Sequence, residues 1–278
     1  MTILSSEDMD WLAALLLDVG TAEIMPRFRN LGDGAIQQKT SAADLVTEAD
    51  INAERVITQA LLERYPDAIV IGEEAVADTP ALLDGWSKTE KLAFVIDPVD
   101  GTFNFASGVA SFGVMLSVVS NGETIAGIIH DPVGKDWIMA EKGSGAILRR
   151  LDGRESALKV AQPVGSVGAM IGAASWQYMQ EPERSTIARN QGVCLGSVAY
   201  RCAAQEYRLL CGGHIHFALY NKLMPWDHLA GTLITEEAGG YVRRFDGSVY
   251  RPEHLDGGIL AATDLDSWHM VREELWRA

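Results

Sequence analysis

The chain has 278 residues, 47% of them hydrophobic, which is enough to bury a substantial core in one large domain or two packed subdomains. A formal charge of −15 and a pI near 4.8 argue against nonspecific binding of nucleic acid or anionic membranes, although a metal ion could reverse the field locally for a small phosphate. Three cysteines without CxxC spacing indicate neither a disulfide framework nor a zinc site, and they favour a reducing cytoplasm.

The N-terminal segment predicts a helix and no export signal. Residues 1–10 carry acidic residues where a secretory signal needs positive ones. No run of the chain approaches the roughly 18 to 20 consecutive apolar residues that span a bilayer. Ser5 or Ser6 can cap a first helix, whose apolar residues recur at three- and four-residue spacing. We therefore expect a soluble, cytoplasmic protein without a membrane partner.

The next segments predict a loop and a second helix. Residues 32–41 are polar and contain glycine, which is typical of an exposed loop. Thr47 and Asp50 have the spacing of a capping pair at the start of a helix. Beyond this helix, the short β-branched run 68–71 predicts a buried strand that ends at Glu73.

The remaining elements predict two subdomains that form one compact catalytic unit. Residues 92–96 predict a strand that ends at Asp97, and residues 112–149 predict an antiparallel meander. A turn-rich stretch after residue 150 is the candidate boundary, which divides the chain into an α+β part, 1–150, and an α/β part, 151–278. The second part alternates strands and helices, which favours a layered α/β arrangement. The expected strands are 169–173, 214–219, 241–244 and 258–262, and the expected helices are 199–210, 227–238 and 264–276.

The segment 95–102 carries the strongest chemical signal, because an apolar strand ends abruptly in two acids, a glycine and a hydroxyl. Pro98 blocks the continuation of a central strand, and Asp97 and Asp100 across the turn can direct their oxygens into one cavity. Hard oxygen ligands of this kind suit Mg²⁺, and the carbonyl of Val99 is a plausible further ligand. Taken alone, however, such a pair of acids could merely cap turns.

The residues that follow suggest a phosphate site beside the metal site. Gly101 allows the main chain to approach a ligand closely. If a helix begins near Thr102, its free amides face a bound phosphate. Asp50 and Asp227 also stand where helix N-termini favour an acid, so each could be structural when considered alone.

Four segments in order resemble one known family. Residues 96–102, Ile-Asp-Pro-Val-Asp-Gly-Thr, closely resemble the signature of the inositol monophosphatase family of magnesium-dependent, lithium-sensitive phosphatases. Residues 44–50 are similar to its early motif, residues 71–74 to its glutamate motif, and residues 226–231 to its late tryptophan-aspartate motif. The resemblance spans nearly the whole chain and implies a layered αβαβα sandwich, commonly a homodimer.

The resemblance also implies a set of metal ligands. Glu73, Asp97 and the Val99 carbonyl would hold one metal ion. Asp97, Asp100 and Asp227 would hold a second ion, and Glu73 would also contact a weaker third. The implied cofactor is therefore Mg²⁺, with two or three ions per site and Mn²⁺ as an alternative.

The same resemblance implies how water and phosphate are handled. Asp50 and Thr102 would form the pair that orients and deprotonates the attacking water, and Glu73 joins them through the third ion. The amides of Gly101 and Thr102 would bind phosphate oxygens. Asp227 would also face the substrate. The chemistry would be hydrolysis of a phosphate monoester by metal-activated water.

Two departures from the family pattern concern the substrate. Tyr220, six residues before Trp226, stands where inositol monophosphatases carry a glutamate that holds sugar hydroxyls. Arg201 replaces a glycine of the small-residue segment that also contains Ala203, beside the expected substrate cleft. Its guanidinium could bind a second anionic group or form an internal salt bridge.

These departures leave the substrate open. We expect a small phosphorylated metabolite, with myo-inositol monophosphate as the best single choice. Fructose-1,6-bisphosphate, histidinol phosphate and 3′-phosphoadenosine 5′-phosphate are the alternatives that the family offers. A non-catalytic protein that binds metal or phosphate and regulates a partner is the alternative from another class. A nucleic-acid partner is not expected, because the field is acidic and there is no basic aromatic patch.

Overall fold

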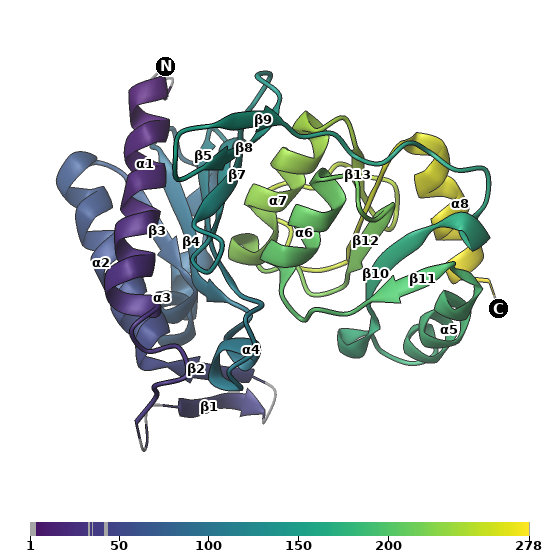
Figure 1. The fold of residues 1–278 in the computed structure, drawn as a ribbon, viewed down its shortest axis with the longest axis horizontal. Helices are drawn as coiled ribbons and strands as arrows, with labels where there is room; N and C mark the ends of the chain where they lie inside the picture. Colours follow the sequence, from purple (N-terminus) through teal and green to yellow (C-terminus); the bar gives the residue numbers. More distant parts are fainter. Residues whose placement is uncertain (1–3, 33, 35, 42–43, 278) are drawn as a thin grey trace.

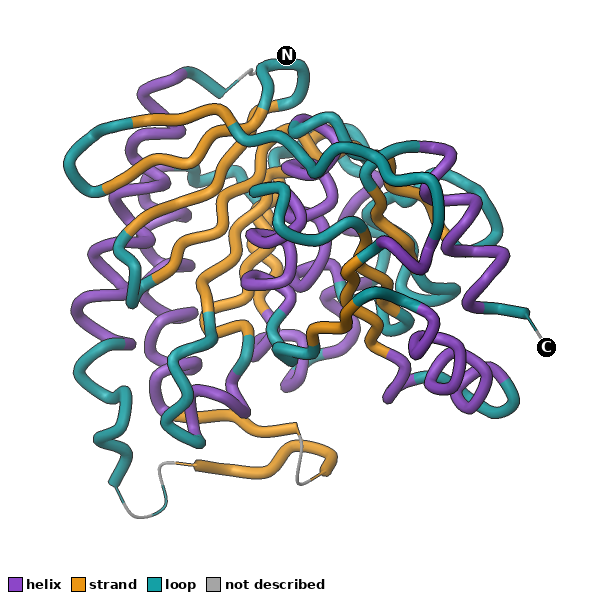
Figure 2. Tube along the Cα trace, turned by 45° about the vertical axis from the view of Figure 1, so that its right-hand side comes forward, coloured by secondary structure: helices purple, strands orange, loops and turns teal. Residues whose placement is uncertain are grey.

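The computed structural model describes residues 4–32, 34, 36–41 and 44–277. Its layers follow the order helix, sheet, helix, sheet, helix (Figure 1). This arrangement confirms the expected αβαβα sandwich. The two sheets appear side by side with helices between them when the molecule is turned by 45° (Figure 2).

The larger sheet of the described chain, here called the first sheet, has seven strands in the order β3-β4-β5-β6-β7-β8-β9. β3 is parallel to β4, and each later neighbour is antiparallel, which confirms the predicted meander. The strands are β3 (Ile69–Gly72), β4 (Ala93–Asp100), β5 (Gly113–Ser120), β6 (Glu123–Asp131), β7 (Asp136–Glu141), β8 (Ala146–Arg150) and β9 (Glu155–Ala157).

The second sheet of the described chain has five strands in the order β11-β10-β12-β14-β13. β10 is parallel to both β11 and β12, whereas β14 is antiparallel to both β12 and β13. The strands are β10 (Ile171–Ser175), β11 (Gly196–Val198), β12 (Phe217–Tyr220), β13 (Tyr241–Arg244) and β14 (Ile259–Ala262). The pattern predicted four of them to within a few residues but not the short edge strand β11.

Helices cover both sheets. α1 and α2 lie on the outer face of the first sheet, α6 and α7 lie between the sheets, and α5 and α8 lie beyond the second sheet (Figure 1). Among the described residues, none of the helices has the length and apolar character needed to cross a bilayer. The helices are α1 (Ser6–Val19), α2 (Glu48–Arg64), α3 (Glu73–Asp78), α4 (Thr102–Ala106), α5 (Glu183–Asn190), α6 (Ala203–Cys211), α7 (Pro225–Glu237) and α8 (Leu265–Leu275).

Successive side chains of a strand point to opposite faces of the sheet, so one strand contributes residues to two hydrophobic cores. In β5, Leu116 packs in the core under α1 and α2, whereas its neighbour Met115 packs against α6 and α7. In β14, Ala261 faces the same central core, and Leu260 packs toward α8. Such strands are apolar on both faces, because both faces of each sheet are covered by helices.

The predicted helix caps are confirmed. Ser5 caps α1 and forms a capping box with Asp8. Thr47 caps α2, and the Asp50 carboxylate accepts a hydrogen bond from the Thr47 amide at 2.9 Å. This bond fixes Asp50 at the first turn of α2.

Two expectations were wrong. The segment 32–41 is not a loop throughout, because β1 (Ile36–Ser41) pairs with β2 (Asp44–Thr47) in an antiparallel hairpin beside α4 (Figure 1). The strand expected to end at Asp97 continues as β4 to Asp100, with an irregular register between these two acids. Pro98 is tolerated because this irregularity leaves it outside the regular ladder.

The division of the chain at residue 150 stays a prediction. β9, at residues 155–157, still belongs to the first sheet. α7 from the second half packs against β5, β6 and β7 of the first half. The two halves therefore share a continuous packed interior.

Candidate active site

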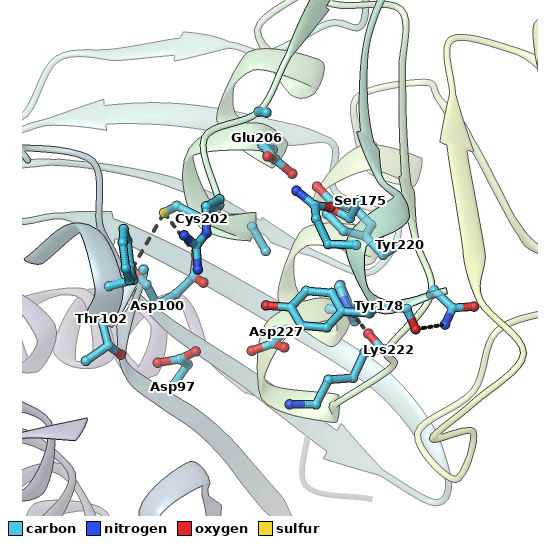
Figure 3. A pocket seen from close by; sticks show the side chains of 18 of the residues that line it. Asp97, Asp100, Thr102, Ser175, Tyr178, Cys202, Glu206, Tyr220, Lys222 and Asp227 are labelled. Atoms are coloured by element: carbon cyan, nitrogen blue, oxygen red, sulfur yellow. Dashed lines mark hydrogen bonds between the residues drawn. The ribbon is translucent and has the colours of Figure 1, made fainter. Parts of the chain in front are cut away.

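A cavity of about 480 Å³ lies where the ends of β4, β10 and β12 meet the starts of α4, α6 and α7 (Figure 3). Its wall contains Glu73, Asp97 and Asp100 from the first half of the chain and Asp227 from the second. Sequence reasoning predicted that these acids converge, and the structure brings them together in one cavity.

Three aspartates form the centre of the site. One carboxylate oxygen from each of Asp97, Asp100 and Asp227 lies within 4.8 Å of the others. Asp97 and Asp100 are buried at the end of β4, and Asp227 lies in the first turn of α7. Clustered hard oxygen donors of this kind fit a divalent cation such as Mg²⁺.

Hydrogen bonds fix the direction of the two β4 carboxylates. The Val99 amide donates to Asp97 Oδ1 at 3.0 Å within the irregular segment of β4. Asp100 Oδ2 accepts from the Ala204 amide and from the Cys202 thiol, with a sulfur-to-oxygen distance of 3.1 Å. The start of α6 thus holds Asp100 in place.

Burial and mutual repulsion disfavour charge on these acids in the absence of a cation. Burial raises the pKa of Asp97 well above its usual value, and the charge of Glu73 raises it further. Burial likewise raises the pKa of Asp100 to about 6 and that of Asp227 to about 8. A bound cation would offset this repulsion, because it favours the ionised form of each ligand.

Thr102 and Asp50 lie in direct contact beside the aspartate cluster. The Thr102 hydroxyl lies 3.0 Å from Asp50 Oδ1 and 3.0 Å from the carbonyl oxygen of Val99. A hydroxyl has one hydrogen, so Thr102 donates to one of these acceptors at a time. Asp50 is fully buried, and burial raises its pKa to about 6 against the opposing effect of its bonds to Thr47.

Gly101 holds a conformation that only glycine adopts easily. Its φ is +90°, and a Cβ at this position would lie 2.9 Å from the Ser111 carbonyl oxygen. Gly101 is the N-cap of α4, whose first residue is Thr102. The tight turn therefore exposes the start of α4 to the cavity that contains the aspartates.

Glu73 is positioned by a residue that sequence reasoning missed. Glu54 of α2 is buried and accepts hydrogen bonds from the amides of Glu74 and Ala75, both at 2.8 Å. It thereby caps α3, of which Glu73 is the first residue. No sequence signal identified Glu54, because a glutamate in a helix usually faces solvent.

The expected substrate residues also line the cavity. Arg201 is exposed, has a φ of +53°, and places its guanidinium 3.9 Å from the centre of the Phe103 ring. Ala203 begins α6, and Tyr220 ends β12 with 5% of its surface exposed. The two roles considered for Arg201, an anion site and an internal salt bridge, stay predictions.

Two further cavity residues escaped the sequence analysis. Glu206 of α6 is 3% exposed, and Lys222 is exposed in the connection between β12 and α7. Glu206 lies three positions after Ala203, so helical spacing could have placed both on one face. Lys222 lies close enough to Asp227 for its charge to oppose the rise in the pKa of that acid.

Comparisons with known proteins agree with this arrangement. Residues 8–277 match the inositol monophosphatase family. A fructose-1,6-bisphosphatase/inositol-1-monophosphatase of Thermotoga maritima is 32% identical over 214 residues, which cover 76% of each chain. A Nus factor SuhB of Vibrio cholerae is 27% identical over 79% of this chain and 78% of its own. The solved structure of an IMPase from Thermotoga maritima superimposes with a TM-score of 0.77 at 25% identity, covering 97% of this chain and 95% of that one.

Proposed function

The chain belongs to the inositol monophosphatase family, and on this basis we propose that it hydrolyses a small phosphate monoester with water activated by Mg²⁺. Membership of this family identifies the protein as a metal-dependent phosphomonoesterase. One observation carries the finer proposal. Thr102, which is hydrogen-bonded to the buried Asp50, lines the same cavity as the three converging aspartates, so a water activator and a cation site lie together.

We assign the metal ligands as follows. Glu73, Asp97 and the Val99 carbonyl would hold one Mg²⁺ ion. Asp97, Asp100 and Asp227 would hold a second, with Glu73 contributing to a weaker third. When bound, the ions lower the pKa of a coordinated water, neutralise the phosphoryl oxygens and stabilise the leaving alkoxide. The 4.8 Å grouping of the three aspartates supports this assignment, and Mn²⁺ has the same preference for oxygen ligands.

The chain's own groups would orient and deprotonate the nucleophile. With Asp50 ionised, Thr102 donates its hydrogen to Oδ1, a contact of 3.0 Å. The Thr102 oxygen is then free to accept a hydrogen bond from the attacking water, and the proton passes toward the Asp50 carboxylate. The amides of Gly101 and Thr102 would hold the phosphate oxygens in line.

The second half of the chain would supply the leaving-group side of the cavity. Asp227 faces the substrate beside the ions, and Arg201, Ala203 and Tyr220 form part of the wall beyond it. We keep myo-inositol monophosphate as the best single substrate. One relative carries the name fructose-1,6-bisphosphatase as well as inositol-1-monophosphatase, so a bisphosphate remains the main alternative.

We also propose the wider setting that the sequence predicted. The residues 1–150 and 151–278 would act as two subdomains of one catalytic unit, since the cavity takes its acids from both. The protein would be a cytoplasmic homodimer that binds no nucleic acid. The net charge of −15 supports the absence of a nucleic-acid partner, and the free cysteines Cys194, Cys202 and Cys211 support a reducing cytoplasm. The homodimer rests on the family resemblance alone, and gel filtration tests it.

The experiment that tests the function measures phosphate release in Mg²⁺ from myo-inositol 1-phosphate, fructose 1,6-bisphosphate, histidinol phosphate and 3′-phosphoadenosine 5′-phosphate. Hydrolysis should stop when a chelator is added and return with excess Mg²⁺. Asp97→Asn should abolish turnover in a protein that stays folded. A protein that releases no phosphate from any of these compounds, or that ignores the chelator, contradicts the proposal. For the non-catalytic alternative, Asp97→Asn should instead keep its binding to the partner protein.

A further inference from the structure

Asn104, the third residue of α4, lies behind the cavity wall and joins the two halves of the chain. It is 7% exposed and does not line the cavity. Its side-chain nitrogen Nδ2 donates to the carbonyl oxygen of Ser111 at 2.8 Å and to that of Tyr200 at 2.7 Å. An amide NH₂ group has two hydrogens, so these bonds use both. One buried side chain therefore links α4 to a segment of the first half and to a segment of the second.

The bond to Ser111 supports the turn that begins α4. The Ser111 carbonyl oxygen lies 2.9 Å from the position that a Cβ of Gly101 would take, so the two segments pack closely. Gly101 is the N-cap of α4, and its carbonyl accepts the amide hydrogen of Phe105 at 3.0 Å. Asn104 thus holds in place the segment against which this turn packs.

The bond to Tyr200 anchors the segment that leads into α6. The Tyr200 amide donates to Glu206 at 3.1 Å, while the Tyr200 carbonyl accepts from Asn104. The next residue, Arg201, has a φ of +53°, which is uncommon for a residue with a side chain. Such a conformation persists where the surrounding structure over-determines it, and the hydrogen bonds on both sides of Tyr200 provide part of this constraint.

Thr102 lies in the same helical turn as Asn104. Its hydroxyl is 3.0 Å from Asp50 Oδ1 of α2. Thr102 and Asn104 are two positions apart, so their side chains point in different directions around the helix. A helix of five residues has few hydrogen bonds of its own, and its orientation therefore depends on such tertiary contacts. α4 is held by α2 through Thr102 and by the segment before α6 through Asn104.

We propose that Asn104 is a positioning residue that fixes α4, and with it the Thr102 hydroxyl, between the two halves of the chain. This inference rests on the proposed phosphatase function and assigns a role in it to a residue outside the cavity wall. The Thr102 oxygen must hold the attacking water in line with the phosphorus, and an error of about 1 Å in such a position can cost about 10²-fold in rate. The two carbonyl contacts of Asn104 set this position.

A double-mutant cycle tests whether Asn104 acts through Thr102. Asn104→Ala removes both donors, and Asn104→Asp removes them at constant shape. With saturating Mg²⁺ and the fastest of the four esters named above, each variant should lower kcat by about 10- to 100-fold and leave KM within about threefold of wild type. In a Thr102→Val background the same changes should lower kcat by less than about twofold, because the hydroxyl that they position is already absent. Equal losses in both backgrounds would overturn the inference.

Hydrogen exchange tests the link between the halves without any substrate. In Asn104→Ala, the amides of residues 101–106 and those of residues 199–204 should both exchange about tenfold faster than in wild type, because each segment loses an anchor. Faster exchange confined to residues 101–106 would show that Asn104 does not fix the segment before α6, and the inference would then be wrong.

Asn190 offers a matched control. Its Nδ2 also donates to backbone carbonyls, those of Leu275 at 3.1 Å and Arg277 at 2.6 Å, beyond the second sheet (Figure 1). Asn190→Ala should lower the melting temperature and leave kcat and KM unchanged.

The two Asn104 variants separate lost hydrogen bonds from lost packing. Full activity of Asn104→Asp beside a slow Asn104→Ala would show that packing alone matters, and this result would overturn the inference. If Asn104→Asp does not fold, Asn104→Ala carries the test, because alanine favours a helix and leaves room for water at the two carbonyls.

Two outcomes distinguish this inference from the proposed function. If wild type hydrolyses an ester and the Asn104 variants keep its kcat, the inference fails and the phosphatase stands. If wild type hydrolyses no phosphate ester in Mg²⁺, the proposed function has failed, and with it the role of Asn104, even where the exchange rates confirm the link.

Discussion

The Glu54 carboxylate occupies the space beside Gly72 that a side chain at that position would need. A Cβ built on Gly72 would overlap the carboxylate of Glu54. From this position Glu54 accepts the amide hydrogens of Glu74 and Ala75 and so fixes the start of α3. Glu73, a proposed metal ligand, begins that helix. Gly72 and the buried Glu54 therefore act together to position Glu73, although neither of them is itself a proposed metal ligand.

Gly72→Ala should weaken metal binding. The new methyl group must displace the Glu54 carboxylate, since both would occupy one space in a packed interior. We expect a loss of about 1–3 kcal/mol in the free energy of unfolding and a several-fold rise in the Mg²⁺ concentration for half-maximal activity. Thermal unfolding and Mg²⁺ titration of activity measure these two effects. Gly192→Ala, where a Cβ has open space, is the matched control and should change neither.

Glu54→Gln tests the cap itself at nearly constant volume. One of the two oxygens becomes an NH₂ group, which faces an amide hydrogen and cannot accept it. We expect a destabilisation of about 1–3 kcal/mol from the unpaired buried group. The Mg²⁺ dependence should shift to higher concentration while kcat in saturating Mg²⁺ recovers. A loss of kcat that excess Mg²⁺ does not restore would contradict a positioning role.

The sequence identified the residues proposed to act on substrate and metal more successfully than the residues that hold them in position. Asp97 and Asp100 stand out because polar residues follow an apolar strand, and Thr47 with Asp50 has a recognisable capping spacing. Glu54 escaped because its burial depends on a tertiary contact with a turn about 20 residues later in the chain. Local patterns contain no signal for such a contact.

The limits of local patterns also explain the errors in the fold. Pro98 predicts the end of a strand, yet β4 continues because its partner β5 accommodates a register shift between Asp97 and Asp100. The hairpin strand β1 is polar and therefore resembled a loop. In both places the pairing partner, rather than the local sequence, determines the backbone.

The Thr102–Asp50 pair predicts that removal of either the hydroxyl or the carboxylate lowers kcat. Thr102→Val keeps the shape of the side chain but removes the hydroxyl, and Asp50→Asn removes the proton acceptor. Each should lower kcat by about 10²- to 10⁴-fold with a small change in KM, because water activation acts in the transition state. Thr102→Ser keeps the hydroxyl and should retain most of the activity. A Thr102→Val enzyme as active as Thr102→Ser would exclude the pair from water activation.

Removal of metal should make stability depend on pH in a defined direction. Burial raises the pKa of Asp227 to about 8 and that of Glu206 to about 7. Groups whose folded-state pKa is raised stabilise the fold fully below their unfolded-state pKa, and this contribution is lost as the pH rises through the folded-state value. Burial lowers the pKa of His130 and His228 to about 4, and these histidines oppose the trend only below about pH 6.5. The informative window is therefore pH 6.5 to 8.5.

In a chelator, the melting temperature should fall as the pH rises across this window. Mg²⁺ should raise it most at the alkaline end, because ionised carboxylates bind the cation without first losing a proton. Asp227→Asn removes a proposed ligand whose pKa burial raises to about 8, so the metal-free profile of this variant should be flatter above pH 7. Thermal unfolding of wild type and variant, each with chelator and with Mg²⁺, gives all four profiles. A metal-free melting temperature that rises toward pH 8.5 would mean that these acids are not held protonated by burial, and the electrostatic account of the cation site would then be wrong.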